Sequence, residues 1–407
     1  MTLNFIYGIL ISFFYRSCYV IMGEKLIGNS ENSSLKRSEK LYSVDFLRFI
    51  FSMIIVYFHI FHDNIMSFTN DSGFYKKLYE NSNGDVLVEC FFLLSGFFMF
   101  YSFKKHGSIT FGRYAYSKVA RLWPTLFFAI LLEVAFFNGS AFNGFFNALF
   151  LQCNGLSLNF SGINWYVSPL FWTFLFYFGL HKLVKNEKTF CFLTAVMSYI
   201  SYLLVFNAND GAFSRGIGFG FVSLAMCRAI GGLGIGYLIA TIVQNLKENG
   251  FEERATNTKL KKIIVFIIAS IGEAVPLGLI LLNCFYKKFD FNTNLYDVLL
   301  FAILMLFLPF KAGIFSKITN NKFFGFLGRY SYSIYVTQSA VILILQRTLW
   351  LNTSFVVDHA LRCIAVSLVF SFIFSVATYY IIEKPGAMLF KKAQKLFFKP
   401  ESKTKSE

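Results

Sequence analysis

Residues 43–64 read SVDFLRFIFSMIIVYFHIFHDN. Apart from Arg48 and His59, most of this stretch is apolar, and a helix needs roughly 20 mostly apolar residues to cross a bilayer. Comparable runs recur to the end of the chain. The sequence therefore predicts ten membrane spans, at residues 44–66, 86–103, 122–138, 165–183, 189–206, 218–243, 262–284, 295–310, 330–347 and 361–382.

The composition supports this prediction. Of the 407 residues, 56% are hydrophobic and 15% charged, against about 25% charged in a soluble chain. We expect an all-α, polytopic integral membrane protein with about ten transmembrane helices. Its parts would be a partly polar N-terminal segment at 1–43, a membrane domain at 44–386 and a basic tail at 387–407. Whether residues 1–21 form a further span stays open, because the apolar run at 3–14 is short.

Basic residues are distributed very unevenly between the two sides. Under one alternation of sides, the first side holds 29 of the 38 Lys and Arg residues: five in 23–48, five in 104–121, three in 182–188, five in 244–262, four in 311–329 and seven in 383–407. The other side holds Lys76, Lys77, Arg215, Lys287, Lys288 and Arg347. Cytoplasmic loops collect Lys and Arg, so we expect a multi-pass protein of the cytoplasmic membrane with both core termini in the cytoplasm. Nucleic acid is not an expected partner, because no soluble basic domain exists to bind it.

Two charged or titratable groups share one face of the first span. Arg48 and His59 are eleven residues apart, which at about 100° per residue is roughly 20° past three full turns, and about 16 Å along the helix axis. Groups of this kind inside a membrane usually face a cavity or a partner. The plainer readings are that Arg48 snorkels to the cytoplasmic surface and that His59 is a hydrogen-bonded packing residue.

Other polar groups lie within the predicted spans. Glu89, early in the second span, is expected at nearly the depth of His59. There it can orient the imidazole for catalysis, or the two groups can be hydrogen-bond partners with only a structural role. Arg228 and Glu273, each near the middle of its span, are predicted to form a buried ion pair. No metal site is predicted, since His59, His62 and Asp63 have no further ligand in evidence.

Six motifs in order carry a resemblance to a known family. They are R-x10-H at 48–59, ECFFLLSGF at 89–97, KVARLWP at 118–124, GINWYVSPLFW at 162–172, FLGRYSYSIYVTQ at 326–338 and IIEKP at 381–385. Together they resemble the membrane acyltransferase-3 family, bacterial O-acyltransferases that decorate surface polysaccharides.

The resemblance implies transfer of an acyl group, usually acetyl, from cytoplasmic acyl-CoA to a sugar hydroxyl, with acyl-CoA as donor substrate and no bound cofactor. The family's functional positions match His59 and Glu89 as catalytic residues, and Arg48, Ser95, Lys118, Arg121 and Trp165 as substrate-binding residues. Two positions depart from the family pattern. Leu170 stands where many members carry Glu, and Gln338 where members often show His.

Physical reasoning agrees with that assignment. A basic rim of Arg48, Lys118 and Arg121 suits the phosphates of CoA, which cannot cross a bilayer unaided. His59 is then expected to act on the acceptor hydroxyl as a general base or as a covalent acyl relay, and the sequence does not choose between them. The alternatives are a transporter or flippase for a glycan-type substrate, and a membrane scaffold without catalytic activity.

Overall fold

The computed structural model describes residues 40–61, 84–106, 109–136, 140–153, 164–208, 222–286, 293–350 and 353–398. The regular secondary structure in these ranges is helical. Its elements are α2 (Tyr42–Ile60), α5 (Asp85–His106), α6 (Phe111–Phe136), α7 (Ala141–Ala148), η2 (Asn164–Tyr166), α8 (Val167–Leu183), α9 (Glu187–Ala208), α10 (Leu224–Glu248), α11 (Phe251–Ala255), α12 (Lys259–Tyr286), α13 (Thr293–Phe307), η3 (Leu308–Phe310), α14 (Ile314–Thr319), α15 (Lys322–Leu327), η4 (Gly328–Tyr330), α16 (Ser331–Gln346), α17 (Thr353–Asp358), α18 (Ala360–Thr378), η5 (Tyr379–Glu383) and α19 (Lys384–Phe397).

The prediction of an all-α, polytopic membrane protein is confirmed. Each of the ten predicted spans overlaps a helix. Among the described residues, seven helical segments are long and apolar enough to cross a membrane. They contain α2, α5, α6, α9, α10, α12 and α18. The helices at the other three predicted spans are shorter: α8 has 17 residues, α13 has 15 and α16 has 16.

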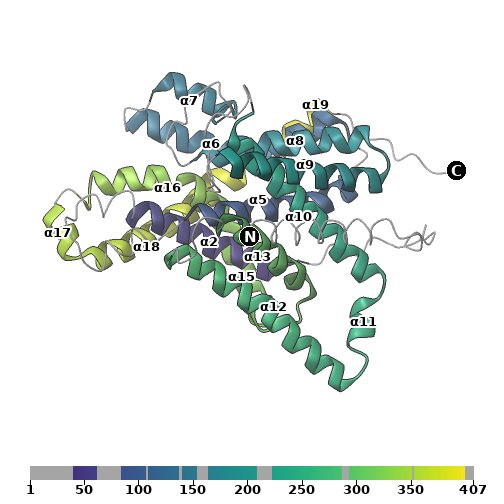
Figure 1. Cartoon of the computed structure of the whole chain (residues 1–407). Helices are drawn as coiled ribbons and strands as arrows, with labels where there is room; N and C mark the ends of the chain where they lie inside the picture. The colour runs from purple at the N-terminus through teal and green to yellow at the C-terminus, as the bar shows by residue number, and fades with distance from the viewer. Residues whose placement is uncertain are drawn as a thin grey trace.

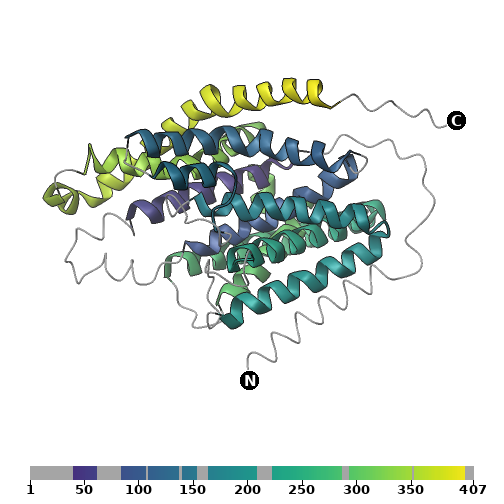
Figure 2. The ribbon, with the colours of Figure 1, turned by 90° about the horizontal axis from the view of Figure 1, so that it is seen from above.

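The helices lie side by side and run roughly across the page in Figures 1 and 2. We call the end that carries α11 and the α5–α6 connection the basic end, because the Lys- and Arg-rich connections gather there. The end that carries α7 and α17 is the opposite end. Of the predicted N-terminal segment 1–43 and the predicted basic tail 387–407, residues 1–39 and 399–407 lie outside the described residues.

Two central helices, α5 and α10, form the middle of the bundle, and their most apolar stretches are 78% and 89% buried. Their backbones approach closely because glycines occupy the contact. A Cβ at Gly96 would lie 1.9 Å from the Leu233 carbonyl oxygen, and one at Gly236 would lie 1.9 Å from the Leu93 carbonyl oxygen. Small residues allow this kind of close packing between membrane helices.

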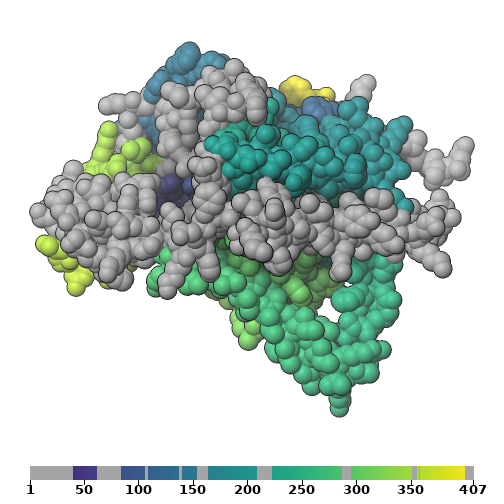
Figure 3. Space-filling view, in the orientation of Figure 1, coloured from purple at the N-terminus to yellow at the C-terminus, as the bar shows by residue number. Residues whose placement is uncertain are grey.

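The peripheral helices expose apolar side chains, as lipid-facing helices do. The most apolar part of α12 is only 28% buried, and α12 projects with α11 from the body of the molecule (Figure 3). Its exposed residues include Ile264, Ile267, Ile268 and Ile271.

Two boundaries differ from the predicted ones. The first four residues of the KVARLWP motif, 118–121, were predicted in the connection 104–121, but they are helical, because α6 begins at Phe111 and continues through Pro124. A proline inside a helix leaves a carbonyl short of its usual donor. Near Pro124, the Leu122 carbonyl accepts a hydrogen bond of 2.6 Å from the Tyr332 hydroxyl. The carbonyl that lacks its donor is that of Ala120, so this bond ties α6 to α16 near the proline and does not replace the missing one.

The last span continues beyond its predicted end. α18 runs through the π-helical turn η5 into α19, so that residues 360–397 form one helical segment. α19 packs on the basic-end half of α6, where Gln394 donates to the Arg113 carbonyl at 3.2 Å and the Phe390 ring lies 5.8 Å from that of Trp123. Figure 2 shows α19 lying along one side of the bundle.

Candidate active site

Two parallel helices, α2 and α16, set the frame of the candidate site. The Ser52 hydroxyl donates to the Ser331 carbonyl oxygen at 3.1 Å, which fixes the register between them. Farther toward the opposite end, Ile60 and Phe61 belong to the same apolar cluster as Val341 and Leu345. The two helices therefore advance together from the basic end, and residues equally distant from Ser52 and Ser331 lie at about the same level.

A cavity of about 160 Å³ opens beside this pair of helices. Its lining comes from α2, α5, α6, η2, α8 and α16, which are far apart in sequence. The lining residues are Arg48, Phe91, Leu94, Ser95, Phe98, Met99, Ser102, Lys118, Arg121, Leu122, Tyr166, Leu170, Phe174, Ser331, Tyr332 and Tyr335. Four of the seven predicted site residues are thus brought together around one cavity: Arg48, Ser95, Lys118 and Arg121.

A second pocket, of about 210 Å³, adjoins the first. The two share Arg48, Arg121, Ser331 and Tyr332. The second pocket adds one cation, Arg329, and two carboxylates, Asp45 and Glu383. Arg48 and Arg121 therefore stand where the inner cavity meets a pocket lined by both signs of charge.

The cations of the cavity are held in partly buried positions. Asp45 lies 3.9 Å from the Arg48 guanidinium, one helical turn away. The Lys118 ammonium stands over the Phe174 ring, 3.9 Å from its centroid. A cation over an aromatic face is stabilised electrostatically, so this cavity can keep positive charge facing an anionic ligand.

Aromatic side chains form the end of the cavity that lies toward the opposite end of the bundle. The Ser95 and Tyr166 hydroxyls are 3.3 Å apart, and either can donate. The Tyr166 ring lies 5.4 Å from that of Tyr335 and 6.2 Å from that of Phe91. These contacts between α5, η2 and α16 close the cavity around Ser95.

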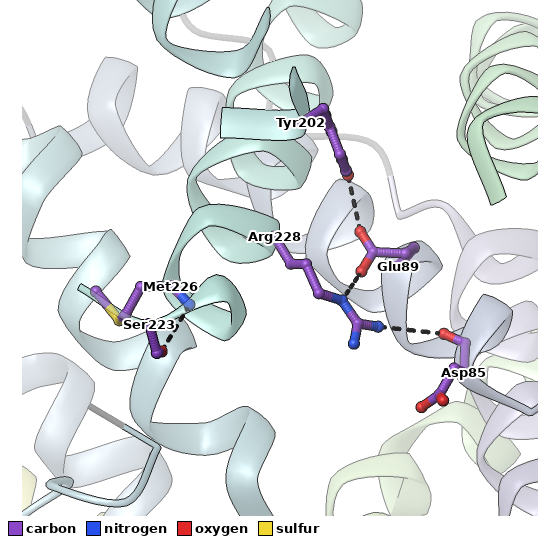
Figure 4. Close-up of polar contacts among 6 residues, drawn as sticks. All are labelled: Asp85, Glu89, Tyr202, Ser223, Met226 and Arg228. Atoms are coloured by element: carbon purple, nitrogen blue, oxygen red, sulfur yellow. Dashed lines mark hydrogen bonds and ion pairs between the residues drawn. The ribbon is translucent and has the colours of Figure 1, made fainter. Parts of the chain in front are cut away.

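Behind this wall lies a buried charged cluster, shown in Figure 4. The Arg228 Nε donates to Glu89 Oε1 at 2.5 Å, and the Tyr202 hydroxyl donates to Glu89 Oε2 at 2.8 Å. Both charged side chains are fully buried. The Trp165 ring centroid is 4.9 Å from the Arg228 guanidinium carbon, so Trp165 belongs to this cluster, and the described lining of the cavity does not include it.

The predicted ion pair between Arg228 and Glu273 is wrong. Arg228 pairs with Glu89, whereas Glu273 accepts hydrogen bonds from Ser316, at 3.0 Å from the backbone nitrogen and 2.5 Å from the hydroxyl. A carboxylate suits this place, because the first N–H groups of a helix such as α14 lack intrahelical partners. Similar depth in the membrane therefore did not identify the partner of Arg228.

His59 lies at the far end of α2, beyond the cavity. Tyr335 is four residues past Ser331, which puts it level with Val56, four residues past Ser52. His59 is three residues farther, or about 4.5 Å at 1.5 Å per residue. The described hydrogen bonds of Glu89 go to α9 and α10, so direct orientation of His59 by Glu89 stays a prediction.

Another buried carboxylate has a partner on α16. Glu133 accepts a hydrogen bond from the Ser339 hydroxyl, a contact that the sequence did not suggest.

Within the described ranges, no group of three or more His, Cys, Asp or Glu side chains is placed to hold a metal ion. His62 and Asp63 lie outside those ranges.

Residues 41–380 match a protein family described as an acyltransferase domain. This chain belongs to the acyltransferase 3 family. It is accordingly a membrane-bound O-acyltransferase, and the matched region contains the cavity and most of the second pocket. No curated protein and no solved structure matches the chain.

Sequence reasoning missed several residues that build the site of this acyltransferase. Tyr166, Tyr332 and Tyr335 line the cavity, although the first lies in the GINWYVSPLFW motif and the other two in FLGRYSYSIYVTQ. Glu383 of the IIEKP motif lines the second pocket and accepts a hydrogen bond of 2.5 Å from the Ser333 hydroxyl. The motifs contained these residues, but no spacing argument singled them out.

Proposed function

We propose that this acyltransferase takes an acetyl group from acetyl-CoA at the cytoplasmic side and transfers it to a hydroxyl of a surface or lipid-linked carbohydrate. In this proposal the basic end of the bundle faces the cytoplasm of a bacterial cell. The observation that carries it is the cavity lined by Arg48, Lys118 and Arg121, which adjoins a second pocket that contains a further arginine and two carboxylates.

The two pockets suit the two parts of an acyl-CoA, the charged nucleotide and the less charged pantetheine arm. The nucleotide end carries phosphates, for which guanidinium groups are good bidentate partners; Arg48, Arg121 and Arg329 supply three of them. The pantetheine arm is narrow and much less charged. The inner cavity, walled by Leu94, Phe98 and other apolar side chains, suits that arm and directs the thioester toward Ser95 and Tyr166.

In the transfer step, the acceptor hydroxyl oxygen attacks the thioester carbonyl carbon. A new C–O bond forms, the C–S bond breaks, and CoA leaves as a thiolate. In this mechanism His59 removes the hydroxyl proton, which is then available to the departing sulfur. Tyr335, at the aromatic end of the cavity, lies three residues short of the level of His59, which is about 4.5 Å and less than one helical turn. In this proposal a donor that fills the cavity brings its acyl group close to the imidazole.

Glu89 fits a positioning role in this scheme. It joins α5 to α10 through Arg228 and to α9 through Tyr202. Trp165 stands over the same guanidinium and directly precedes Tyr166, which lines the cavity. Glu89 thus supports the wall against which the acyl group would lie.

The test measures transfer of labelled acetyl from acetyl-CoA to glycan extracted from cells that lack this protein, using purified full-length protein in nanodiscs. His59→Ala should lower turnover by about 10² to 10⁴, as loss of a general base does. His359→Ala, which changes a half-buried histidine at the same end, is the matched control. Label trapped on wild-type protein but not on His59→Ala would instead assign the covalent relay.

The donor site is tested in the same assay. Arg121→Gln should raise the KM for acetyl-CoA roughly tenfold or more, since hydrogen bonds to charged groups contribute about 1.5–3 kcal/mol. Arg113→Gln, two turns away on α6 and outside the described pocket linings, should leave it unchanged. Wild-type protein that binds acetyl-CoA or glycan without transferring acetyl would contradict the proposal and favour a transporter.

A further inference from the structure

One buried amide in the membrane domain has no hydrogen-bond partner among the described residues. Gln338 on α16 is fully buried, and both its Nε2 and its Oε1 are without a partner there. Leaving a buried polar group unsatisfied is costly. Neighbouring polar side chains on α16 are satisfied: Thr337 donates to the Ser333 carbonyl and Ser339 to Glu133.

Gln338 lies on the same face of α16 as two residues that line the cavity. At about 100° per residue, it lies within roughly 20° of Ser331 and 60° of Tyr335 around the helix axis, and both of those residues line the cavity. It follows Tyr335 by less than one turn. Gln338 therefore lies about 4.5 Å past the level of Tyr335 along the helix axis, on the face of α16 that lines the cavity.

His59 reaches the same level from α2. Gln338 is seven residues past Ser331 and His59 is seven residues past Ser52, and those two serines are hydrogen-bonded. His59 also lies on the face of α2 that carries Arg48 (about 20° apart), and Arg48 lines the cavity. The two residues are thus placed on adjoining helices and at one level, each on the helix face that lines the cavity nearer the basic end.

We propose that the Gln338 amide binds the acceptor carbohydrate and holds the reacting hydroxyl beside His59, an inference that rests on the proposed function. An amide offers N–H donors and a carbonyl acceptor at once. A sugar with neighbouring hydroxyls presents both complements, so it satisfies both orphaned atoms of Gln338. A thioester carbonyl, which only accepts, satisfies only the Nε2 side.

The experiment compares Gln338→Met with wild type in nanodiscs, using labelled acetyl-CoA and the glycan from cells that lack the protein. Methionine keeps the length of the side chain and removes both polar atoms. The KM for glycan should rise about 10- to 100-fold, while the KM for acetyl-CoA and acetyl-CoA hydrolysis without glycan stay within twofold. Gln346→Met, an exposed glutamine on the same helix, is the matched control.

Thermal unfolding separates binding from a structural role. Removing an unsatisfied amide should leave the melting temperature of Gln338→Met equal to that of wild type or higher. A lower melting temperature together with an unchanged KM for glycan would overturn the inference, as would a raised KM for acetyl-CoA alone. Both of those outcomes leave the proposed function standing, whereas absence of transfer by wild type removes the function as well.

Discussion

Arg228 gives the clearest case of one residue whose partner depends on the fold. Its guanidinium is fully buried against Glu89, and its Nη2 also donates to the Asp85 carbonyl at 3.5 Å. Burying a charged side chain inside a membrane costs free energy, and such side chains usually pair with one another. The pair joins α5 to α10 at the back of the candidate site, so it contributes to the shape of the cavity as well as to its stability.

We expect Arg228→Met to destabilise the protein by about 3–5 kcal/mol, because it leaves the Glu89 carboxylate buried without its cation. Adding Glu89→Gln should recover most of that loss, since the remaining amide is neutral and keeps the Tyr202 hydroxyl as a partner. Unfolding in detergent, followed by tryptophan fluorescence, measures both variants. The control combines Arg228→Met with Glu273→Gln; equal recovery in the two double variants would contradict the pairing.

Between elements, the decisive contact is the one between α5 and α10. Gly236 approaches the Leu93 backbone, and Gly232 lies against Phe92. In a bilayer there is little hydrophobic force between helices, so close van der Waals packing matters more. Because the backbones of α5 and α10 lie so close together, the short side chain of Glu89 on α5 can reach Arg228 on α10.

Gly236→Ala should destabilise the protein by roughly 1–3 kcal/mol or more, as overpacking does, since the new Cβ would meet backbone atoms that cannot rotate away. Gly278→Ala on α12 is the matched control, because nothing lies within 4 Å of its new Cβ. Alanine in a helix is favoured over glycine by up to about 1 kcal/mol, so the control should be neutral or stabilising. Equal melting temperatures for the two variants would count against the close contact.

The molecule as a whole is polarised along the helix direction. The connections at the basic end hold most of the cations, and the second pocket, with Arg48, Arg121 and Arg329, lies among the elements there. The positive-inside rule predicts that this end of the protein faces the cytoplasm. In the proposed function, the same asymmetry would present the arginines of the two pockets to an anionic cytoplasmic donor.

Cysteine labelling tests this orientation in a variant that lacks the native cysteines. Lys105→Cys and Ala141→Cys are both exposed positions, flanking opposite ends of α6. We expect an impermeant maleimide to label Ala141→Cys in intact spheroplasts, and Lys105→Cys only after permeabilisation. The reverse pattern would invert the orientation and place the donor cavity on the wrong side for cytoplasmic acyl-CoA.

Helix placement was largely predictable from the sequence, because a span must be both apolar and long enough, and both properties are local. Helix ends were less predictable. α6 includes Lys118 and Arg121, which read as a polar connection, because packing against Tyr332 and α19 extends the helix. Hydropathy identifies helix segments that contact lipid, whereas the first turns of α6 are stabilised by contacts with other helices of the protein.

The sequence by itself determined that the chain crosses a membrane many times, where its cations gather, and that Arg48 and His59 share one helix face, since all three follow from composition and helical period. Only the tertiary structure decided which groups meet. It paired Arg228 with Glu89, gave Glu273 to Ser316 and placed Gln338 level with His59. Partners on different helices depend on helix order, register and rotation, and these are set by packing between segments that lie far apart in the chain.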